Sequence, residues 1–480
     1  MSESKSFTTD KELAMIHSTS LRILSELGIL INHSGMRERL VEQGCRIKGE
    51  RVIIPEELVS DVIKKIPPAF RLYGRDTQDS VFVEAKGQTL YTNSGIVPNI
   101  LDFENGVVRR TVKRDVELTT RILDELSNVD FIYVSLLDAT EMSPHMVTVT
   151  NMAVILEYTT KPLAGPGVTN RAEAEAIVAM VQAIRGNDPR ELAAYPICAP
   201  FICPITPLNF PFDIVEALIV IAEAGLPLMV VTNPVMGFTS PFTIAGTIAL
   251  GHAEVLATAV MAHAIHPGIP ILSHNTPTIA DMKTLVNTTG GPEVGLMRRT
   301  IIELSRSLGI PSWAPGHTSS AHLDIQAGDE KSINALLIAS AHPSILGGLG
   351  GLANITMTSY ECLVLDNERY GAIRRILEGV AIDEAHLAFN VIADQVAGVE
   401  VIANPHTLNH LRSRETWKPT IAHRKGLVNG LPEAETILER ARRETRRIMD
   451  EHEVLPLPPF VKNRITEILE NYNSKVLTQC

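Results

Sequence analysis

Residues 311–352 read PSWAPGHTSSAHLDIQAGDEKSINALLIASAHPSILGGLGGL. This stretch contains a short β-rich run at 311–314, a helical pattern at 329–341 and a second short β-rich run at 344–348. A strand, a helix and a strand in this order form the unit that connects neighbouring parallel strands. The stretch therefore predicts an α/β fold with a parallel sheet.

The same alternation extends on both sides of this stretch. Short β-rich runs occur at 89–92, 130–136, 162–165, 195–198, 227–232, 270–273, 311–314 and 344–348. Each is followed by a helical pattern, at 113–127, 144–157, 170–185, 211–224, 241–265, 292–307, 329–341 and 356–378. This order and length are typical of a (β/α)8 TIM barrel. A doubly wound sheet fits less well, because no GxGxxG follows the first strand.

Two extensions flank the predicted barrel. We expect an N-terminal α+β cap over residues 1–85, the barrel over 86–380 and a helical C-terminal extension over 381–480. In the cap, Thr8 or Thr9 is suited to begin a helix and Gly28 to end it. Residues 100–108, with Asn105-Gly106, predict a β-hairpin over the first barrel loop.

Composition excludes several classes of protein. The chain has 480 residues, with 43 basic and 55 acidic side chains and a net charge of −12, which argues against a nucleic-acid partner. Its five scattered cysteines do not form a disulfide framework and fit a reducing compartment. The N-terminus lacks an apolar signal segment, and the longest apolar runs are interrupted by Glu216 and Glu223. We expect a cytoplasmic protein with no membrane partner, and a homo-oligomer.

Candidate site residues follow the predicted strands, because barrels carry their chemistry on the loops at the carboxyl ends of the strands. Aromatic rings attract quaternary ammonium groups. The aromatic candidates are Tyr91, Phe201, Phe210, Trp313 and Tyr360. The polar candidates are Asn93, Ser94, His274, His317, His322 and Asp324.

Other chemistries remain open for some of these residues. His274, His317, His322 and Asp324 would suit zinc or iron, but the HxH that usually ends a first strand is missing. Cys198 and Cys203 have no second thiol pair, so we interpret them as packing residues. The glycine run 347–351 has three interpretations: a phosphate site, a surface for a large flat group, or a tight connection between strand and helix.

The loop with Asp324, Gln326, Gly328 and Glu330, followed by a helix and a glycine-rich strand, resembles the trimethylamine methyltransferase superfamily. The resemblance covers most of the chain, including Tyr91-Thr92-Asn93-Ser94-Gly95. It implies a corrinoid-dependent barrel that demethylates methylamines. The founding enzyme of the superfamily carries pyrrolysine, whereas residues 311–352 of this chain are all standard amino acids.

For a member without pyrrolysine, the resemblance implies a substrate with a good leaving group, such as a quaternary amine. We expect glycine betaine to be converted to dimethylglycine, with the methyl group passing to the Co(I) of a corrinoid protein. The corrinoid should be carried by a partner, because the chain lacks DxHxxG, and no bound metal is expected. The alternatives are a metal-dependent barrel hydrolase or lyase, and a non-catalytic protein that binds quaternary amines.

The residues expected to carry this reaction fall into three sets. His342 and Tyr91 are the favoured donors to a betaine carboxylate. Substrate-binding residues are expected to be Asn93, Phe201, Phe210, His274, Trp313 and Tyr360. Residues expected to face the corrinoid are Asp324, Gln326, Glu330, Gly347, Gly348 and Gly350, of which the first three orient their loop.

Overall fold

The structure, a computed structural model, describes residues 7–95, 97–134, 139–413, 415–427 and 435–478. Its first helix, α1 (Asp10–Arg22), begins at Thr9, whose hydroxyl accepts the amide of Glu12 while the Glu12 carboxylate accepts the amide of Thr9. A short π-helical turn (Ile23–Leu27) extends this helix to Gly28, where φ is +70°. A β-carbon at Gly28 would collide with the backbone of Val52, so a glycine is required. Both predicted helix boundaries are confirmed.

A small sheet joins the N-terminal region to the middle of the chain. Its strands, in the order β12-β1-β3-β2, are β12 (Asn209–Phe210), β1 (Ile29–Ile31), β3 (Arg51–Ile53) and β2 (Arg46–Lys48), accompanied by α2 (Ser34–Glu42) and α3 (Glu56–Lys65). Strand β12 pairs in parallel with β1, and Phe210 lies opposite Ile31. The N-terminal layer is therefore completed by a strand from the centre of the chain.

The central strands alternate with helices along the chain. They are β6 (Leu90–Asn93), β9 (Ile132–Tyr133), β10 (Leu163–Ala164), β11 (Phe201–Ile202), β13 (Leu228–Thr232), β15 (Ile271–Asn275), β18 (Trp313–Pro315) and β19 (Ile345–Leu349). They pair in parallel within three short sheets, β10-β9, β11-β13-β15 and β18-β19-β6. Further backbone contacts link these sheets, including the parallel bridge Ser273–Ser312 and the hydrogen bond from the Asp130 amide to the Tyr91 carbonyl.

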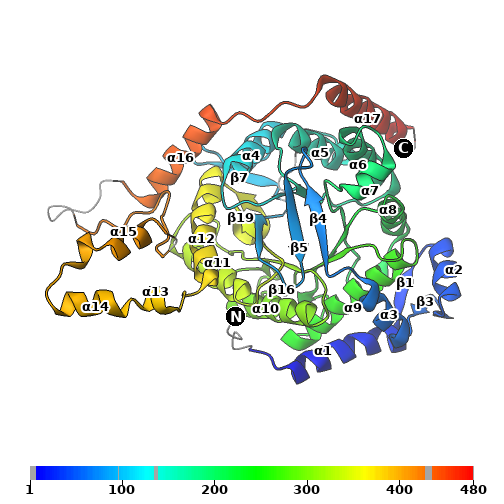
Figure 1. Cartoon of the computed structure of the whole chain (residues 1–480). Helices are drawn as coiled ribbons and strands as arrows, with labels where there is room; N and C mark the ends of the chain where they lie inside the picture. Colours follow the sequence, from blue (N-terminus) through cyan, green and yellow to red (C-terminus); the bar gives the residue numbers. More distant parts are fainter. Residues whose placement is uncertain (1–6, 96, 135–138, 414, 428–434, 479–480) are drawn as a thin grey trace.

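Helices surround these strands (Figure 1). They are α4 (Lys113–Glu125), α5 (Val147–Tyr158), α6 (Arg171–Ile184), α7 (Pro189–Ala194), α8 (Phe212–Glu223), α9 (Ile244–His263), α10 (Pro292–Ser307), α11 (Ile325–Ala339) and α12 (Tyr360–Glu378). All eight predicted helices are confirmed within a few residues, and α7 is an addition. Helix α9 has the length and apolar composition of a membrane span, but 83% of its most apolar window is buried inside the molecule.

One predicted strand was misplaced. The run 195–198 was expected to form a strand, whereas β11 begins at Phe201. The carbonyls of Ile197 and Ala199 do accept the amides of Leu163 and Gly165 from the β10 side. Pro196 and Pro200 have no N–H to donate, so regular pairing starts only after Pro200.

A hairpin covers the amino ends of the central strands. It consists of β4 (Ala69–Tyr73) and β5 (Ser80–Glu84), paired antiparallel, and it crosses the middle of the molecule in Figure 1. Its inward side chains form one apolar cluster with side chains of β13, β15, β18 and β19 (Phe70, Leu72, Val83, Met229, Leu272, Trp313 and Ile345). The hairpin thus fills the amino end of the core.

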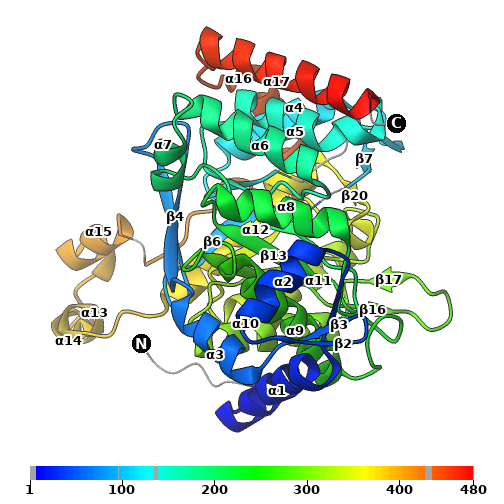
Figure 2. The same ribbon diagram turned by 90° about the vertical axis from the view of Figure 1, so that its right-hand side faces the viewer.

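Shorter hairpins lie at the carboxyl ends. The predicted hairpin at 100–108 is confirmed as β7 (Asn99–Leu101) and β8 (Val108–Arg110), and β7 also pairs with β20 (Met357–Thr358). Strands β14 (Val235–Met236), β16 (Thr278–Ala280) and β17 (Asn287–Thr288) form another small sheet. The β16–β17 hairpin projects from the side of the molecule opposite to the hairpin β4–β5 (Figure 2).

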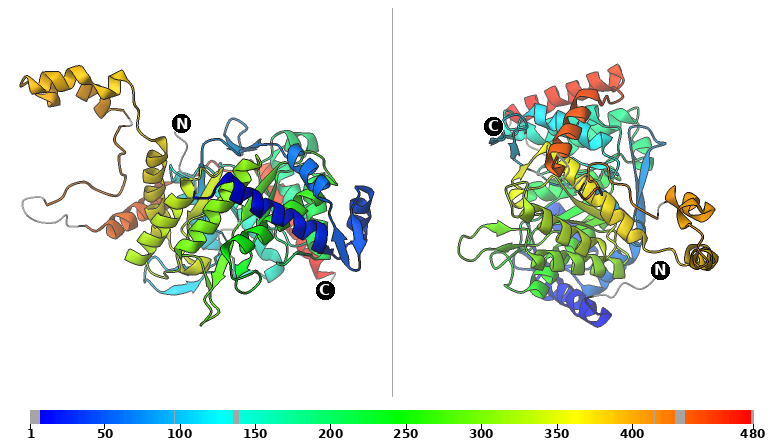
Figure 3. Two further views of the ribbon diagram at one scale, coloured as in Figure 1. Left: turned by 90° about the horizontal axis from the view of Figure 1, so that it is seen from below. Right: turned by 90° about the vertical axis from the view of Figure 1, so that its left-hand side faces the viewer.

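The C-terminal extension is helical, as predicted, but divides into two parts. Helices α13 (Glu384–Leu387), α14 (Phe389–Val396) and α15 (Pro405–Leu411) stand away from the rest of the molecule (Figures 1 and 3). Helices α16 (Ile437–Glu451) and α17 (Pro459–Leu477) return to the body, where α16 packs on α12 and α4, and α17 packs on α5 and α6.

Candidate functional site

Four rings gather among the central strands. Tyr133 of β9, Phe201 of β11, His274 of β15 and Trp313 of β18 all point into the core. The imidazole of His274 stacks on the indole of Trp313 with ring centroids 4.3 Å apart, and Tyr133 meets that indole edge-on at 4.6 Å. Phe201 lies 5.8 Å from Tyr133. The predicted residues Phe201, His274 and Trp313 are therefore brought together.

Polar atoms in this cluster have no hydrogen-bond partner within the described residues. They are Nδ1 and Nε2 of His274 and Nε1 of Trp313, all buried. Burial, and then the charge of the nearby Arg298 guanidinium, lower the pKa of His274 to about 3. His274 is therefore neutral near pH 7. Buried polar groups without partners are uncommon in folded proteins and point to a ligand or to water.

Arg298 brings a buried positive charge to the carboxyl end of β18. It lies on α10 with 1% of its surface exposed, and its Nη1 donates to the carbonyl of Pro315 at 2.7 Å and lies 3.4 Å from Nδ1 of His317. Its Nε and Nη2 have no partner, and no carboxylate of the described residues pairs with it. Burial lowers the pKa of Arg298 to about 9, so the group stays cationic at neutral pH.

His317 connects this arginine to the end of β6. Its Nε2 lies 3.0 Å from the hydroxyl of Ser94. Burial, and then the charges of Arg298 and Lys331, lower the pKa of His317 well below its usual value. Lys331, unlike Arg298, has a carboxylate partner: it pairs with Asp366 at 3.0 Å and also donates to the carbonyls of Gly348 and Gly351. Arg298 is thus the cation with free donors here, among the described residues.

The sequence analysis missed Tyr133 and Arg298. Tyr133 lies inside a predicted strand, and this position could have identified it as an aromatic candidate. Arg298 falls inside a helical pattern, where an arginine is ordinarily interpreted as solvent-exposed. No spacing signal in one sequence distinguishes it from the neighbouring Arg299, which pairs with Glu303.

His342, predicted to bind a substrate carboxylate, lies apart from the four rings. His342 precedes β19 and therefore lies at the amino end of the central strands, opposite to the site. It adopts a left-handed conformation with φ +53° just after α11, and its carbonyl accepts Nη1 of Arg306 at 2.9 Å. The residue terminates a helix and contacts none of the four rings.

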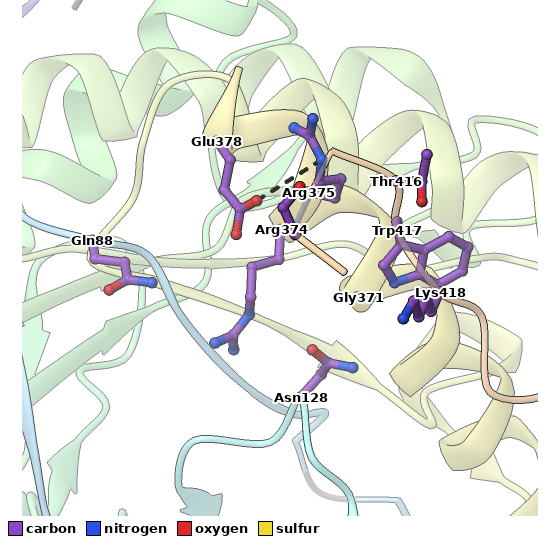
Figure 4. A pocket seen from close by; sticks show the side chains of 10 residues that line it. Gln88, Asn128, Gly371, Arg374, Arg375, Glu378, Thr416, Trp417 and Lys418 are labelled. Atoms are coloured by element: carbon purple, nitrogen blue, oxygen red, sulfur yellow. Dashed lines mark ion pairs between the residues drawn. The ribbon is translucent and has the colours of Figure 1, made fainter. Parts of the chain in front are cut away.

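Tyr91 is also placed outside the site. Its ring points toward α12, where the guanidinium of Arg374 lies 4.6 Å above it and the ring of Tyr370 lies 5.4 Å away. Burial raises the pKa of Tyr91 to about 12. Arg374 itself lines a cavity of about 560 Å³ together with Gln88 and Asn128 (Figure 4). Successive strand residues face opposite sides, and Tyr91 faces the helices.

Three more predicted substrate-binding residues have structural contacts instead. The amide of Asn93 accepts the N–H and donates to the carbonyl of Tyr133, so it bridges β6 and β9. Phe210 packs in the N-terminal sheet opposite Ile31. The hydroxyl of Tyr360 donates to Asp115 at 2.7 Å, between α12 and α4. The structure thus gives these three side chains roles in holding elements together.

Asp324, Gln326 and Glu330 orient their loop, as predicted. The Asp324 carboxylate accepts the amide of Ala327 and begins α11, and the Glu330 carboxylate accepts the hydroxyl of Thr318 and the amide of Ser319. Gln326 donates to Glu330 at 2.9 Å.

The glycine run is buried and faces protein atoms. A β-carbon at Gly347 would strike the indole of Trp313, one at Gly348 the backbone of Gly316, and one at Gly350 the side chain of Leu363. Gly348 and Gly350 also have φ of +115° and +81°. The glycines are explained by close packing, so the predicted surface for a corrin ring is corrected to a tight connection between strand and helix.

The metal ligands considered from the sequence are not gathered. His274 and His317 are buried beside a cationic arginine, whereas His322 and Asp324 are exposed. Burial raises the pKa of Cys198 to about 12 and that of Cys203 to about 11, which keeps both as thiols. The described residues on the central strands and their loops therefore do not support the hydrolase or lyase alternative.

The chain is an α/β protein with a buried site made of aromatic rings and one arginine. Comparison with known proteins gives its family. The chain matches the trimethylamine methyltransferase (MTTB) family over residues 3–475, and it belongs to this family. It is 28% identical to the trimethylamine methyltransferase of Desulfitobacterium hafniense, over 96% of this chain and 93% of that protein. It is 24% identical to the glycine betaine methyltransferase of the same species, over 98% and 97% of the two chains.

A solved structure shares the fold. The monomethylamine methyltransferase of Methanosarcina barkeri superposes with a TM-score of 0.54 at 13% identity, over 93% of this chain and 88% of that one. The chain is thus a methyltransferase of this family without pyrrolysine, which confirms the resemblance inferred from the loop around Asp324.

Proposed function

We propose that this methyltransferase transfers a methyl group from glycine betaine to the Co(I) of a corrinoid protein, and that its central strands form one closed (β/α)8 barrel. The backbone contacts between the three short sheets support the closed barrel. The relative named glycine betaine methyltransferase, which aligns over 98% of the chain, supports the substrate.

The observation that carries the proposal is the buried Arg298 with two free donors. A buried cation without a counter-ion is costly, and a carboxylate from the substrate would relieve that cost. An arginine fork also matches the two oxygens of a carboxylate. Trimethylamine has no carboxylate and would leave Arg298 uncompensated.

The trimethylammonium end of betaine suits the adjacent rings. Tyr133, Phe201 and Trp313 offer aromatic faces close to one another, with the centroid of Tyr133 5.8 Å from that of Phe201 and 4.6 Å from that of Trp313. Each such contact with a cation contributes about 0.5–2 kcal/mol. His274 stays neutral beside them and so does not repel the ammonium group.

The reaction itself requires positioning more than acid–base chemistry. The Co(I) electron pair attacks one N-methyl carbon, a C–Co bond forms, and the C–N bond breaks with its electrons left on nitrogen. The product is neutral at nitrogen, so no proton is needed for the amine to leave. Holding the methyl carbon in line with the acceptor is the main contribution expected from the protein.

The acceptor would approach the carboxyl ends of the strands. The loops on this side expose large apolar side chains, including Phe238 (73% exposed) and Ile325 (82% exposed), together with Phe242, Met282 and Leu285. Such exposed apolar groups are typical of a docking surface for another protein. We propose this rim, and not the buried glycine run, as the surface for the corrinoid protein.

A panel of methylated amines tests the proposal. The purified chain is mixed with chemically reduced cobalamin and each amine in turn, and formation of methyl-Co(III) is followed by absorbance. We expect glycine betaine to react fastest. Faster transfer from trimethylamine, or no transfer from any quaternary amine, would contradict the proposal. Betaine binding without methyl transfer would instead support a non-catalytic binding protein.

A further inference from the structure

The helices α13, α14 and α15 form an arm without an apolar core of its own. None of the three contains a buried residue. Apolar side chains such as Phe389 (74% exposed) and Val396 (85% exposed) point to solvent. Small units that cannot bury enough apolar surface are commonly held together by disulfides or metal ions. Every described cysteine lies outside this arm.

A cluster of metal-ligating side chains connects separate parts of the arm. His386 of α13, His410 of α15 and Glu415 beyond it place their ligand atoms within 4.8 Å of one another. Nε2 of His386 lies 3.4 Å from Oε1 of Glu415, and the rings of His386 and His410 have centroids 5.1 Å apart. The cluster therefore joins α13 to the segment formed by α15 and the residues just after it.

Neighbouring residues orient these ligands. Nδ1 of His386 lies 2.7 Å from the carboxylate of Asp383, so Nδ1 carries the proton and the lone pair of Nε2 faces the cluster. A carboxylate behind a histidine is the usual arrangement around protein-bound zinc. The ring of His406 lies against His410 at 4.2 Å, and its Nε2 is 3.1 Å from the carbonyl of Ala385.

We propose that His386, His410 and Glu415 bind a single zinc-type divalent ion that fastens the arm. Two imidazoles and one carboxylate suit zinc, whereas magnesium and calcium prefer oxygen ligands alone. The ion has a structural role, because the arm lies on the amino-end side of the molecule, opposite to the loops of the substrate site (Figure 2). This site was not predicted from the sequence, because the predicted metal ligands all follow the strands of the barrel.

Zinc titration of the full chain tests this inference. The protein is stripped with a chelator, dialysed at neutral pH and titrated with Zn²⁺ in a calorimeter. We expect saturation at one ion per chain, and affinity weakened by about tenfold or more in His410→Ala and Glu415→Gln. His423→Ala is the matched control, because His423 is an exposed histidine between the same two halves of the extension. Its affinity for zinc should be unchanged.

Two further measurements keep the outcome interpretable. Circular dichroism of each variant checks that the barrel remains folded, and limited proteolysis of the arm should slow when zinc is added to the parent but not to His410→Ala. Absence of zinc binding by the parent, or equal binding by all the variants, would overturn the proposal. Methyl transfer assayed on the same samples reports separately on the function proposed above.

Discussion

The two ends of helix α10 show how differently the same residue type is used. Arg306, near the amino ends of the strands, donates to the carbonyls of Ala85 and His342. Arg298, near the carboxyl ends, is more deeply buried and leaves Nε and Nη2 without acceptors. A buried cation with partners stabilises the fold, whereas one without partners costs stability and indicates a ligand. The comparison supports the proposal that the carboxyl end holds the substrate.

The largest effect on activity is expected at Arg298. Arg298→Leu should lower kcat/KM for glycine betaine roughly a hundredfold or more, which corresponds to a loss of about 3 kcal/mol of transition-state stabilisation. The reason is that the substrate carboxylate loses its partner in a buried site. Steady-state methyl transfer to the corrinoid acceptor measures the loss.

Arg306→Leu on the same helix is the control. It should lower the melting temperature, since two carbonyls lose a donor, and leave kcat/KM per folded molecule unchanged. Equal losses of kcat/KM in both variants would show that the two ends of α10 do not differ in function.

A smaller effect is expected from the rings. Trp313→Leu should raise KM for betaine by about tenfold, because one aromatic face contributes about 0.5–2 kcal/mol to binding an ammonium group. Tyr91→Leu changes a ring that faces Arg374 and α12, so KM should stay within about twofold. If Tyr91→Leu raised KM more than Trp313→Leu, the assignment of the inner rings would be wrong.

The neutral His274 should be visible in the pH dependence of stability. Its pKa is about 3 in the folded chain, below the usual value of 6.5, so the unfolded chain binds more protons between these pH values. The free energy of unfolding should fall as pH decreases from 6.5 toward 3, by up to about 1.4 kcal/mol per pH unit for this residue. His274→Gln should flatten that slope in denaturant titrations. An identical slope in parent and variant would show that His274 is not held neutral.

The smallest effect is expected at His342. His342→Ala leaves the backbone carbonyl that accepts Arg306 and removes a side chain far from the rings, so betaine turnover should remain within about twofold of the parent. Steady-state kinetics of this variant measure the effect. A hundredfold loss of betaine turnover would show that His342 belongs to the substrate site.

The sequence was sufficient for the order of elements. The spacing of apolar residues, and the Gly and Pro residues between the elements, predicted the alternation of strands and helices. Thr9 and Gly28 predicted both ends of α1. The position of the hairpin β4–β5 over the amino ends of the central strands was not predictable, because the local sequence of a hairpin does not indicate which surface it covers. The pairing of β12 with β1 likewise depends on contacts between residues 30 and 209.

The site was only partly predictable for the same physical reason. Trp313 was found because it lies on a predicted strand, and Phe201 and His274 because they follow the ends of predicted strands, where the loops begin. Tyr91 was misassigned because one residue of strand register exchanges the inner and outer faces. His342 was misassigned although it precedes its strand, a position that the direction of a parallel strand places at the amino end.

The most direct test of the account compares binding of glycine betaine and choline, which share the trimethylammonium group and differ in the carboxylate. Calorimetric titration of the parent should show betaine binding about a hundredfold tighter than choline, and Arg298→Leu should abolish most of that difference. Equal affinity of the parent for the two ligands, or an unchanged preference in Arg298→Leu, would contradict the claim that Arg298 receives the substrate carboxylate.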